Sequence, residues 1–386
     1  MSAIKILSRI FIILTSLFYG VVFSGQVLGL LKLYNLHLAL ILSLGISGLV
    51  FYAFATNLRW FDNIVSESES SPNFLNIAFL VSALGLFGLL VFAPLIRWPF
   101  SPISTKLTWD AGLYHFPKAI EMLVTASAWD MTIDYGEYPF GYESMLALAF
   151  GINPDGYLLG FVHALIGFYF FLSFWLVARR FTKLPNELLL FFAAIMILSR
   201  LYLPQNDNNI WWVLWTQIIL IGKNDLLLGA ILLSIILFTP SPQQKVEPNH
   251  LLGLAISSML ALSIKPNSLL LVLCCWCLLV YSLIRSQGWR GAVRKVSLQA
   301  LIVLPGLLWA FRNLIAMGEL FKPNAAKLSR LSIAANLGNP YFYEYIPTQM
   351  YIVLAIILLS IFIAFLKKEN TLPMLLGLAL FLSFIL

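Results

Sequence analysis

Long apolar runs constrain the fold of this 386-residue chain more than any other feature. A helix needs about 20 mainly apolar residues to cross a bilayer, and it satisfies its own backbone hydrogen bonds there. Such runs, some of them short, lie at 6–31, 37–57, 74–96, 156–178, 186–204, 225–239, 251–264, 268–284, 297–316, 349–366 and 371–386. They predict an all-α membrane protein with about ten to eleven transmembrane helices.

The composition agrees with hydrocarbon as the main solvent. Apolar residues make up 60% of the chain and charged residues 11%, whereas soluble domains carry about 25% charged residues. The net charge of +7 would raise nucleic acid as a partner for a soluble protein. Here the basic residues lie mainly between the apolar runs, so we expect membrane lipid and no nucleic acid as their partner.

The basic residues also orient the chain. With Lys5 and Arg9 placed in the cytoplasm, each span reverses direction. The basic clusters at 179–183, 285–295 and 367–368 then fall on the cytoplasmic side, as the positive-inside tendency requires. We therefore expect one polytopic domain in the cell (inner) membrane, with a cytoplasmic N-terminus.

This threading makes 97–140 the large first extracytoplasmic loop, carrying short interfacial helices. The apolar piece 142–151 is too short to span and is expected at the membrane interface. The chain stops inside an apolar run, at 381–386. That ending fits either a last helix that finishes at the terminus or a truncated product.

The cysteines and acids do not predict a metal site. Cys274, Cys275 and Cys277 share one apolar run without metal-type spacing, which favours thiols packed in a helix. Acids of the outer loop are oxygen ligands of the kind that divalent cations accept, but no spacing indicates one. We expect no cofactor.

The loop 97–140 carries most of the predicted chemistry. Asp110, Tyr114 and Lys118 are four residues apart and would share one face of a helix, with His115 one step round. That face is either a salt-bridged helix surface or the wall of a pocket for a polar acceptor and an anionic donor.

Further carboxylates follow at Asp134, Glu137 and Glu143. A carboxylate held against a low-dielectric boundary can be tuned as a general base. We take Asp110 as the candidate base and the three later acids as candidate substrate-binding groups.

Three other predicted outer segments add cations. Lys223 and Asp225 open a short apolar run, where Asp225 is either a helix cap or part of an anion site. Lys265 interrupts a hydrophobic block, as a functional ionisable group or in a simple hairpin turn. Arg312, followed by Asn313, ends a predicted helix and either snorkels or holds a phosphate with its planar fork.

The order of these motifs resembles the GT-C superfamily of polytopic glycosyltransferases, especially the bacterial relatives of protein mannosyltransferases. The resemblance covers about residues 75 to 325. It is carried by an Asp-x-x-x-Tyr stretch (110–114), a Tyr-Pro-Phe-Gly-Tyr-Glu stretch (138–143), a Lys-Pro pair (265–266), and an Arg-Asn pair (312–313) before a Gly-x-x-x-x-Pro loop (318–323). Many members have a second acid after the first, where this chain has Ala111.

The resemblance implies an inverting, metal-free glycosyltransferase. Its donor would be a sugar on a polyprenyl phosphate, its acceptor a glycan, lipid or protein, and its base Asp110. Lys223, Lys265 or Arg312 would hold the leaving phosphate. Two other functions stay open: an O-antigen-type polymerase or ligase, which relies on outer-loop arginines and histidines, and a lipid-linked-sugar transporter without chemistry.

Overall fold

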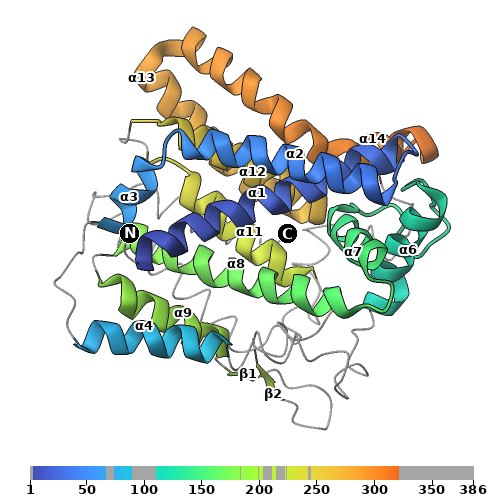
Figure 1. Cartoon of the computed structure of the whole chain (residues 1–386). Helices are drawn as coiled ribbons and strands as arrows, with labels where there is room; N and C mark the ends of the chain where they lie inside the picture. Colours follow the sequence, from blue (N-terminus) through green and yellow to red (C-terminus); the bar gives the residue numbers. More distant parts are fainter. Residues whose placement is uncertain are drawn as a thin grey trace, which may run out of the picture.

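The computed structural model describes residues 3–66, 74–88, 110–182, 184–198, 200–202, 211–213, 222, 224–241 and 245–320. The regular secondary structure of the described part is helical apart from one antiparallel pair of short strands, β1 (Arg200–Tyr202) and β2 (Trp211–Val213) (Figure 1). The helices are α1 (Ala3–Leu30), α2 (Leu36–Ala55), α3 (Arg59–Ser66), α4 (Phe74–Phe87), α6 (Phe116–Thr125), α7 (Gly141–Ile152), α8 (Tyr157–Phe181), α9 (Asn186–Leu198), α11 (Asp225–Phe238), α12 (Pro248–Ile264), α13 (Leu269–Val303) and α14 (Leu308–Met317).

Four described helical segments are long and apolar enough to cross a membrane: Ala3–Leu30, Leu36–Ala55, Tyr157–Phe181 and Pro266–Met317. The shorter apolar helices are α4, α11 and α12. These segments confirm the prediction of a helical, multi-pass membrane protein. They are fewer than the ten to eleven spans predicted, and the predicted spans 349–366 and 371–386 lie outside the described residues.

One predicted helix boundary is wrong. The helix predicted at 186–204 ends at Leu198, and residues 200–202 form β1 instead. The predicted spans 268–284 and 297–316 are separated, because α13 consists of two helical segments that meet at a kink at Gly288, where the backbone is not helical (φ 74°, ψ 172°). The basic residues on either side of this kink are helical, since Arg, Gln and Lys favour helix.

Helix α1 lies at the centre of the fold and packs against α2, α7, α8 and α12 (Figure 1). Small residues allow this close packing, as is typical of membrane helices. A side chain at Gly20 would overlap the Ser43 carbonyl of α2, and one at Gly25 would overlap Ser144 of α7. The short helix α7 was expected at the interface, but it is buried along most of its length.

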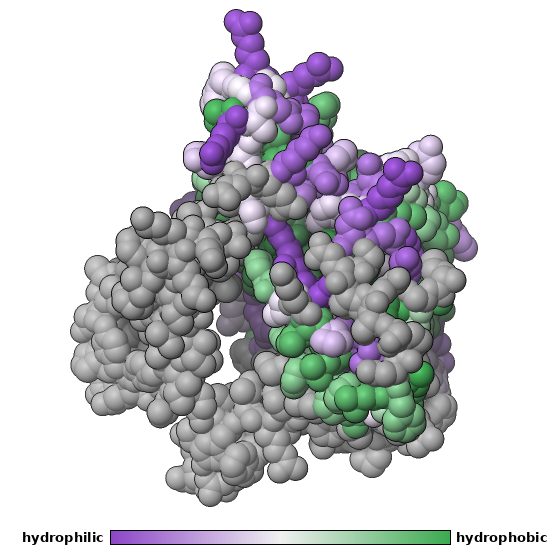
Figure 2. Space-filling view, turned by 90° about the vertical axis from the view of Figure 1, so that its left-hand side faces the viewer, coloured by the Kyte–Doolittle hydropathy of each residue, from purple (hydrophilic) through white to green (hydrophobic). Residues whose placement is uncertain are grey.

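Three arginines lie at one end of the helix bundle. Arg9 pairs with Asp62 of α3 at 2.7 Å. Arg179, near the end of α8, donates to the carbonyls of Ile64, Thr182 and Leu184. Arg180 donates to carbonyls in the last turn of α11. We call this region, which also includes the N-terminal turn of α12, the basic end. Figure 2 looks onto this end and shows hydrophilic residues gathered over its upper part.

The opposite end is formed by α6, α7, α14 and the C-terminal ends of α1 and α12, on the right of Figure 1. Trp129 donates its indole N–H to the Leu30 carbonyl at 2.7 Å, and Trp309 donates to the Leu262 carbonyl at 3.0 Å. We call this region the loop end. Helix α1 runs from the basic end to the loop end and α8 runs back, as the threading of the sequence predicts.

Candidate functional site

Three ionisable side chains are buried together at the loop end. Nδ1 of His115 lies 2.9 Å from Oε1 of Glu143, and Nζ of Lys118 lies 3.5 Å from the same oxygen. The residues are only 1%, 5% and 2% exposed for His115, Lys118 and Glu143 respectively. A buried charge persists only when it is paired and hydrogen-bonded, and this cluster meets both conditions.

A local helix irregularity produces this arrangement. Residues Ala111–His115 form a π-helical turn, in which the Phe116 N–H bonds to the Ala111 carbonyl. The prediction of α-helical spacing from Asp110 to Lys118 is therefore wrong. The wider turn directs His115 and Lys118 inward onto α7, while Tyr114 stays half-buried. Single π-turns of this kind occur frequently at functional sites.

The pKa values of the cluster reflect burial and pairing. Burial raises the pKa of the Glu143 carboxyl, but Lys118 and the hydrogen bond from His115 lower it by more, so the net direction is down. Burial lowers the pKa of the Lys118 ammonium, and Glu143 opposes this without cancelling it. Glu143 is thus held as a carboxylate inside the protein.

The chain 126–140 wraps around Lys118. The ammonium donates to the carbonyls of Tyr135, Tyr138 and Pro139 at 3.4, 3.2 and 3.3 Å. Helix α7 follows at once, so the loop that surrounds Lys118 also places Glu143. The stretch 138–143, one of the four resemblance motifs, is therefore part of this cluster.

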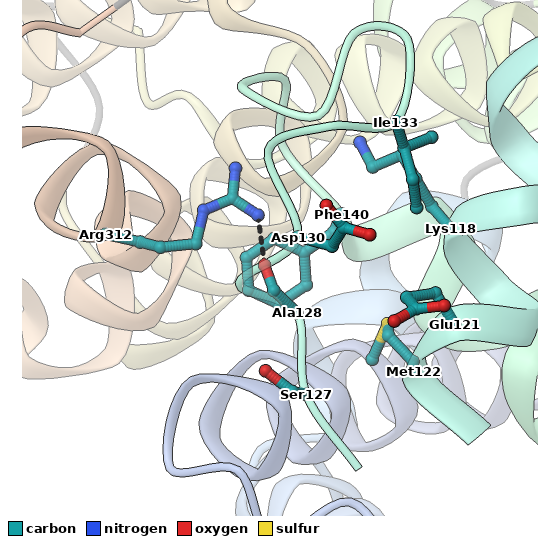
Figure 3. Close-up of a pocket in the computed structure, with 9 residues that line it drawn as sticks. All are labelled: Lys118, Glu121, Met122, Ser127, Ala128, Asp130, Ile133, Phe140 and Arg312. Carbon is teal, nitrogen blue, oxygen red and sulfur yellow. Dashed lines mark hydrogen bonds between the residues drawn. The ribbon is translucent and has the colours of Figure 1, made fainter. Parts of the chain in front are cut away.

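Arg312 ties the same loop to α14. Its guanidinium donates to the carbonyls of Ala128 and Gly136 at 2.6 and 2.7 Å, and it lies 4.9 Å from the Phe140 ring centroid. Figure 3 shows Arg312 reaching across to Ala128 at the edge of a small pocket that Lys118 also lines. The Arg312 guanidinium was predicted to snorkel or to hold a phosphate. In the structure it holds the loop 126–140 in place through these contacts.

Asn313 completes this connection, because its amide donates to the carbonyls of Glu137 and Leu320 at 2.6 and 2.7 Å. The loop includes two non-glycine residues with left-handed backbone, Ala126 (φ 58°) and Tyr135 (φ 56°). That conformation costs about 1 to 2 kcal/mol per residue. The bonds from Arg312 and Asn313 help to hold the chain in it.

A second polar group adjoins the cluster. Burial raises the pKa of the Tyr114 phenol, and the charges of Asp110, Glu143 and Asp225 raise it further. Lys265, at the end of α12, is paired with Asp225 at the start of α11. The structure therefore brings Asp110, Tyr114 and the Asp225–Lys265 pair to the same end as Glu143.

Another predicted site residue, Glu137, acts on this core, because its charge raises the pKa of Lys118. Asp134 is exposed at the rim of the loop, and Glu137 is buried beside it. Lys223 lies outside the described residues. Asp225 does not cap α11 with its side chain, since the N-cap position is Asn224 and has no side-chain capping bond.

Sequence reasoning missed the aromatic walls of the site. The Tyr114 ring lies 4.1 Å from the His115 ring, and the Tyr142 ring meets His115 edge-on at 5.0 Å. Tyr135 contacts Tyr114 with centroids 5.0 Å apart. The signal in the sequence was the density of tyrosines between 135 and 142, which resembles an ordinary interfacial belt.

Among the described residues, no group of three or more His, Cys, Asp or Glu side chains is placed to hold a metal ion. The three cysteines are free thiols in α13. Comparison with known proteins gives no match among protein families, curated proteins or solved structures. The fold and site alone define a multi-pass membrane protein with a buried acid–base cluster at one end of its helices.

Proposed function

We propose that this chain is an integral membrane glycosyltransferase. It transfers a sugar from a polyprenyl-phosphate donor to an acceptor hydroxyl at the loop end, which faces the extracytoplasmic side. The observation that carries the proposal is the Glu143–His115–Lys118 cluster, with Asp110 and Tyr114 beside it. Transfer to a hydroxyl needs a proton acceptor and a site that limits competing attack by water.

An apolar cavity supports a lipid-linked donor. It has a volume of about 230 Å³ and lies between α1, α7 and α8. Its lining includes Met145, Leu148 and Ile152 of α7, the helix that also carries Glu143. One short helix thus connects an apolar space within the bundle to the acid–base cluster, as a donor with a lipid tail and a polar head would require.

The proposed reaction inverts the anomeric carbon. The acceptor oxygen forms a bond to this carbon while its proton passes to a base of the loop end. The bond from the anomeric carbon to the phosphate oxygen breaks, and the electron pair leaves on the phosphate. Lys265 is the half-exposed cation of the site and is suited to the leaving phosphate. The resemblance names Asp110 as the base.

The loop-end geometry favours this function over an arginine-dependent polymerase or ligase. Arg312 uses its guanidinium on Ala128, Gly136 and Asn313 within the protein. Carboxylates and a histidine, rather than arginines, form the reactive group of side chains.

The test uses the purified full-length protein in lipid nanodiscs. It is incubated with undecaprenyl phosphate carrying [14C]glucose, [14C]mannose or [14C]arabinose and with a membrane extract as acceptor. We expect transfer of one label to an extract component, reduced about 100-fold or more in Glu143→Gln and unchanged in the exposed control Asp155→Asn. If no label is transferred while the protein in liposomes moves these donors across the bilayer, the chain is a transporter.

A further inference from the structure

His115 is held in one protonation pattern by its neighbours. A carboxylate accepts hydrogen bonds, so the contact from Nδ1 to Glu143 places the proton of neutral His115 on Nδ1. Lys118, on the same oxygen at 3.5 Å, keeps Glu143 ionised. The basic lone pair of the imidazole is therefore on Nε2.

Nε2 is buried and has no hydrogen-bond partner among the described residues. A buried polar atom without a partner is destabilising by about 1 to 3 kcal/mol and needs an explanation. The other side of the ring is satisfied and fixed by Glu143. A carboxylate that orients an imidazole whose second nitrogen is left for a substrate proton is the arrangement of base and orienting group used in hydroxyl activation.

Groups from every neighbouring element face this imidazole or its immediate surroundings. They are Asp110 and Tyr114 on the π-helical turn, Lys118 on α6, Tyr138 in the loop, Tyr142 and Glu143 on α7, and Asp225 on α11. Of these, Glu143 is hydrogen-bonded to the imidazole, and Lys118 contacts the same carboxylate oxygen. The half-buried Tyr114 ring lies beside the imidazole, with ring centroids 4.1 Å apart.

We propose that His115 is the base that removes the acceptor proton, oriented by Glu143, and that Asp110 is not. This assignment rests on the proposed glycosyl transfer. The acceptor proton moves to Nε2 as the oxygen bonds to the anomeric carbon, and the phosphate departs with the electron pair of the broken bond. Glu143 stabilises the imidazolium that results, and the proton is then released to water.

His250 provides a matched control from the basic end. It is also fully buried, and its Nε2 also has no partner among the described residues. Its Nδ1, however, accepts from the backbone N–H of Glu247 at 3.1 Å rather than donating to a carboxylate. A role that depends on the carboxylate should be present at His115 and missing at His250.

The experiment measures transfer from the same three undecaprenyl-phosphate sugars by His115→Gln, Glu143→Gln, Asp110→Asn and His250→Gln, with folding checked by thermal unfolding. We expect a loss of about 100-fold or more for His115→Gln and less than about tenfold for Asp110→Asn and His250→Gln. Two further readouts exclude a structural role. The acid limb of the rate profile should move to lower pH in Glu143→Gln, and added imidazole should accelerate folded His115→Ala.

If the wild type transfers sugar and His115→Gln keeps its rate within about threefold, the assignment is wrong and the proposed function stands. Folded His115→Ala that imidazole does not accelerate, together with an unmoved acid limb in Glu143→Gln, also overturns it. If the wild type transfers none of the three labels, the proposed function fails and the assignment fails with it.

Discussion

The two ends of the bundle hold cations in similar ways but differ in what lies beside them. At the basic end, Arg179 and Arg180 bind carbonyls at helix ends and in loops, and Arg9 pairs with the partly exposed Asp62. At the loop end, Arg312 and Lys118 also bind carbonyls, but a buried carboxylate and a buried histidine lie with them. Arg179 in particular shows that backbone carbonyls can hold a buried cation in this fold.

The difference indicates which end has a function beyond structure. Cations near helix C-termini are favourable because the carbonyls there are otherwise unpaired. Burying a carboxylate with its cation is seldom more stable than apolar packing of the same volume. The basic end is thus explained by anchoring, whereas the Glu143 cluster fits the proposed reaction.

The largest expected change in stability follows Lys118→Met. It leaves Glu143 buried without its cation, and breaking a buried pair typically costs 3 to 5 kcal/mol, so we expect about 3 kcal/mol or more. The free energy of unfolding in mixed micelles measures it. Arg9→Met at the basic end should cost about 1 kcal/mol or less, since its pair is partly exposed. If Lys118→Met and Arg9→Met lowered the free energy of unfolding equally, the two ends of the bundle would not differ in this way.

Arg312→Lys comes next. An ammonium cannot make the forked contacts with Ala128 and Gly136, so we expect a loss of about 2 kcal/mol. Limited proteolysis should also cut the loop 126–140 faster. The matched change Arg179→Lys should leave that loop protected. Unchanged cleavage of the loop in Arg312→Lys would contradict its role.

Acid should weaken the loop end through Glu143. Its pKa in the folded protein lies below the ordinary value of 4.5. The stabilisation is therefore full above that value and is lost as pH falls through the lower, folded pKa. Below about pH 4.5 the wild type should lose more stability than Glu143→Gln, measured by thermal unfolding across pH. Parallel curves for the two proteins would contradict the direction of the shift.

The smallest effect concerns the bend in α13. Gly288 has a φ of 74°, and a side chain there would meet no neighbour, so Gly288→Ala tests backbone conformation alone. With ψ at 172°, the backbone lies in a region essentially restricted to glycine, so we expect a loss of about 1 kcal/mol or more. Gly85→Ala in α4, which also has open space, should be neutral or slightly stabilising. A stabilised Gly288→Ala would mean that the bend is not required.

Much of the fold follows from the sequence, because hydrocarbon leaves few alternatives to helix. Five of the predicted runs, 6–31, 37–57, 156–178, 225–239 and 251–264, match α1, α2, α8, α11 and α12 within a few residues. The errors have local causes. Residues 200–202 pair with residues 211–213 instead of continuing the helix, and the helices on either side of the kink at Gly288 extend through the basic residues because no proline interrupts them.

The candidate site was predicted as a set of residues and not as an arrangement. Glu143 and His115 were both candidates, yet their pairing across 28 residues depends on the π-helical turn, which no spacing in the sequence indicates. Arg312 was predicted at a helix end but lies in the middle of α14, and its distant partners are backbone carbonyls 174 to 184 residues away. Residues of many types can supply a backbone carbonyl, so no sequence pattern indicates which ones bind Arg312.

The Arg312 contacts have a consequence for how the protein is made. The loop bonds to Leu30 through Trp129 and to α14 through Arg312, so its two anchors lie far apart in the chain. During synthesis α1 enters the membrane early, whereas Arg312 leaves the ribosome only after most of the described helices. The loop end therefore takes its final form late in biogenesis. A nascent chain arrested before residue 312 would insert its first helices with that loop still open to protease.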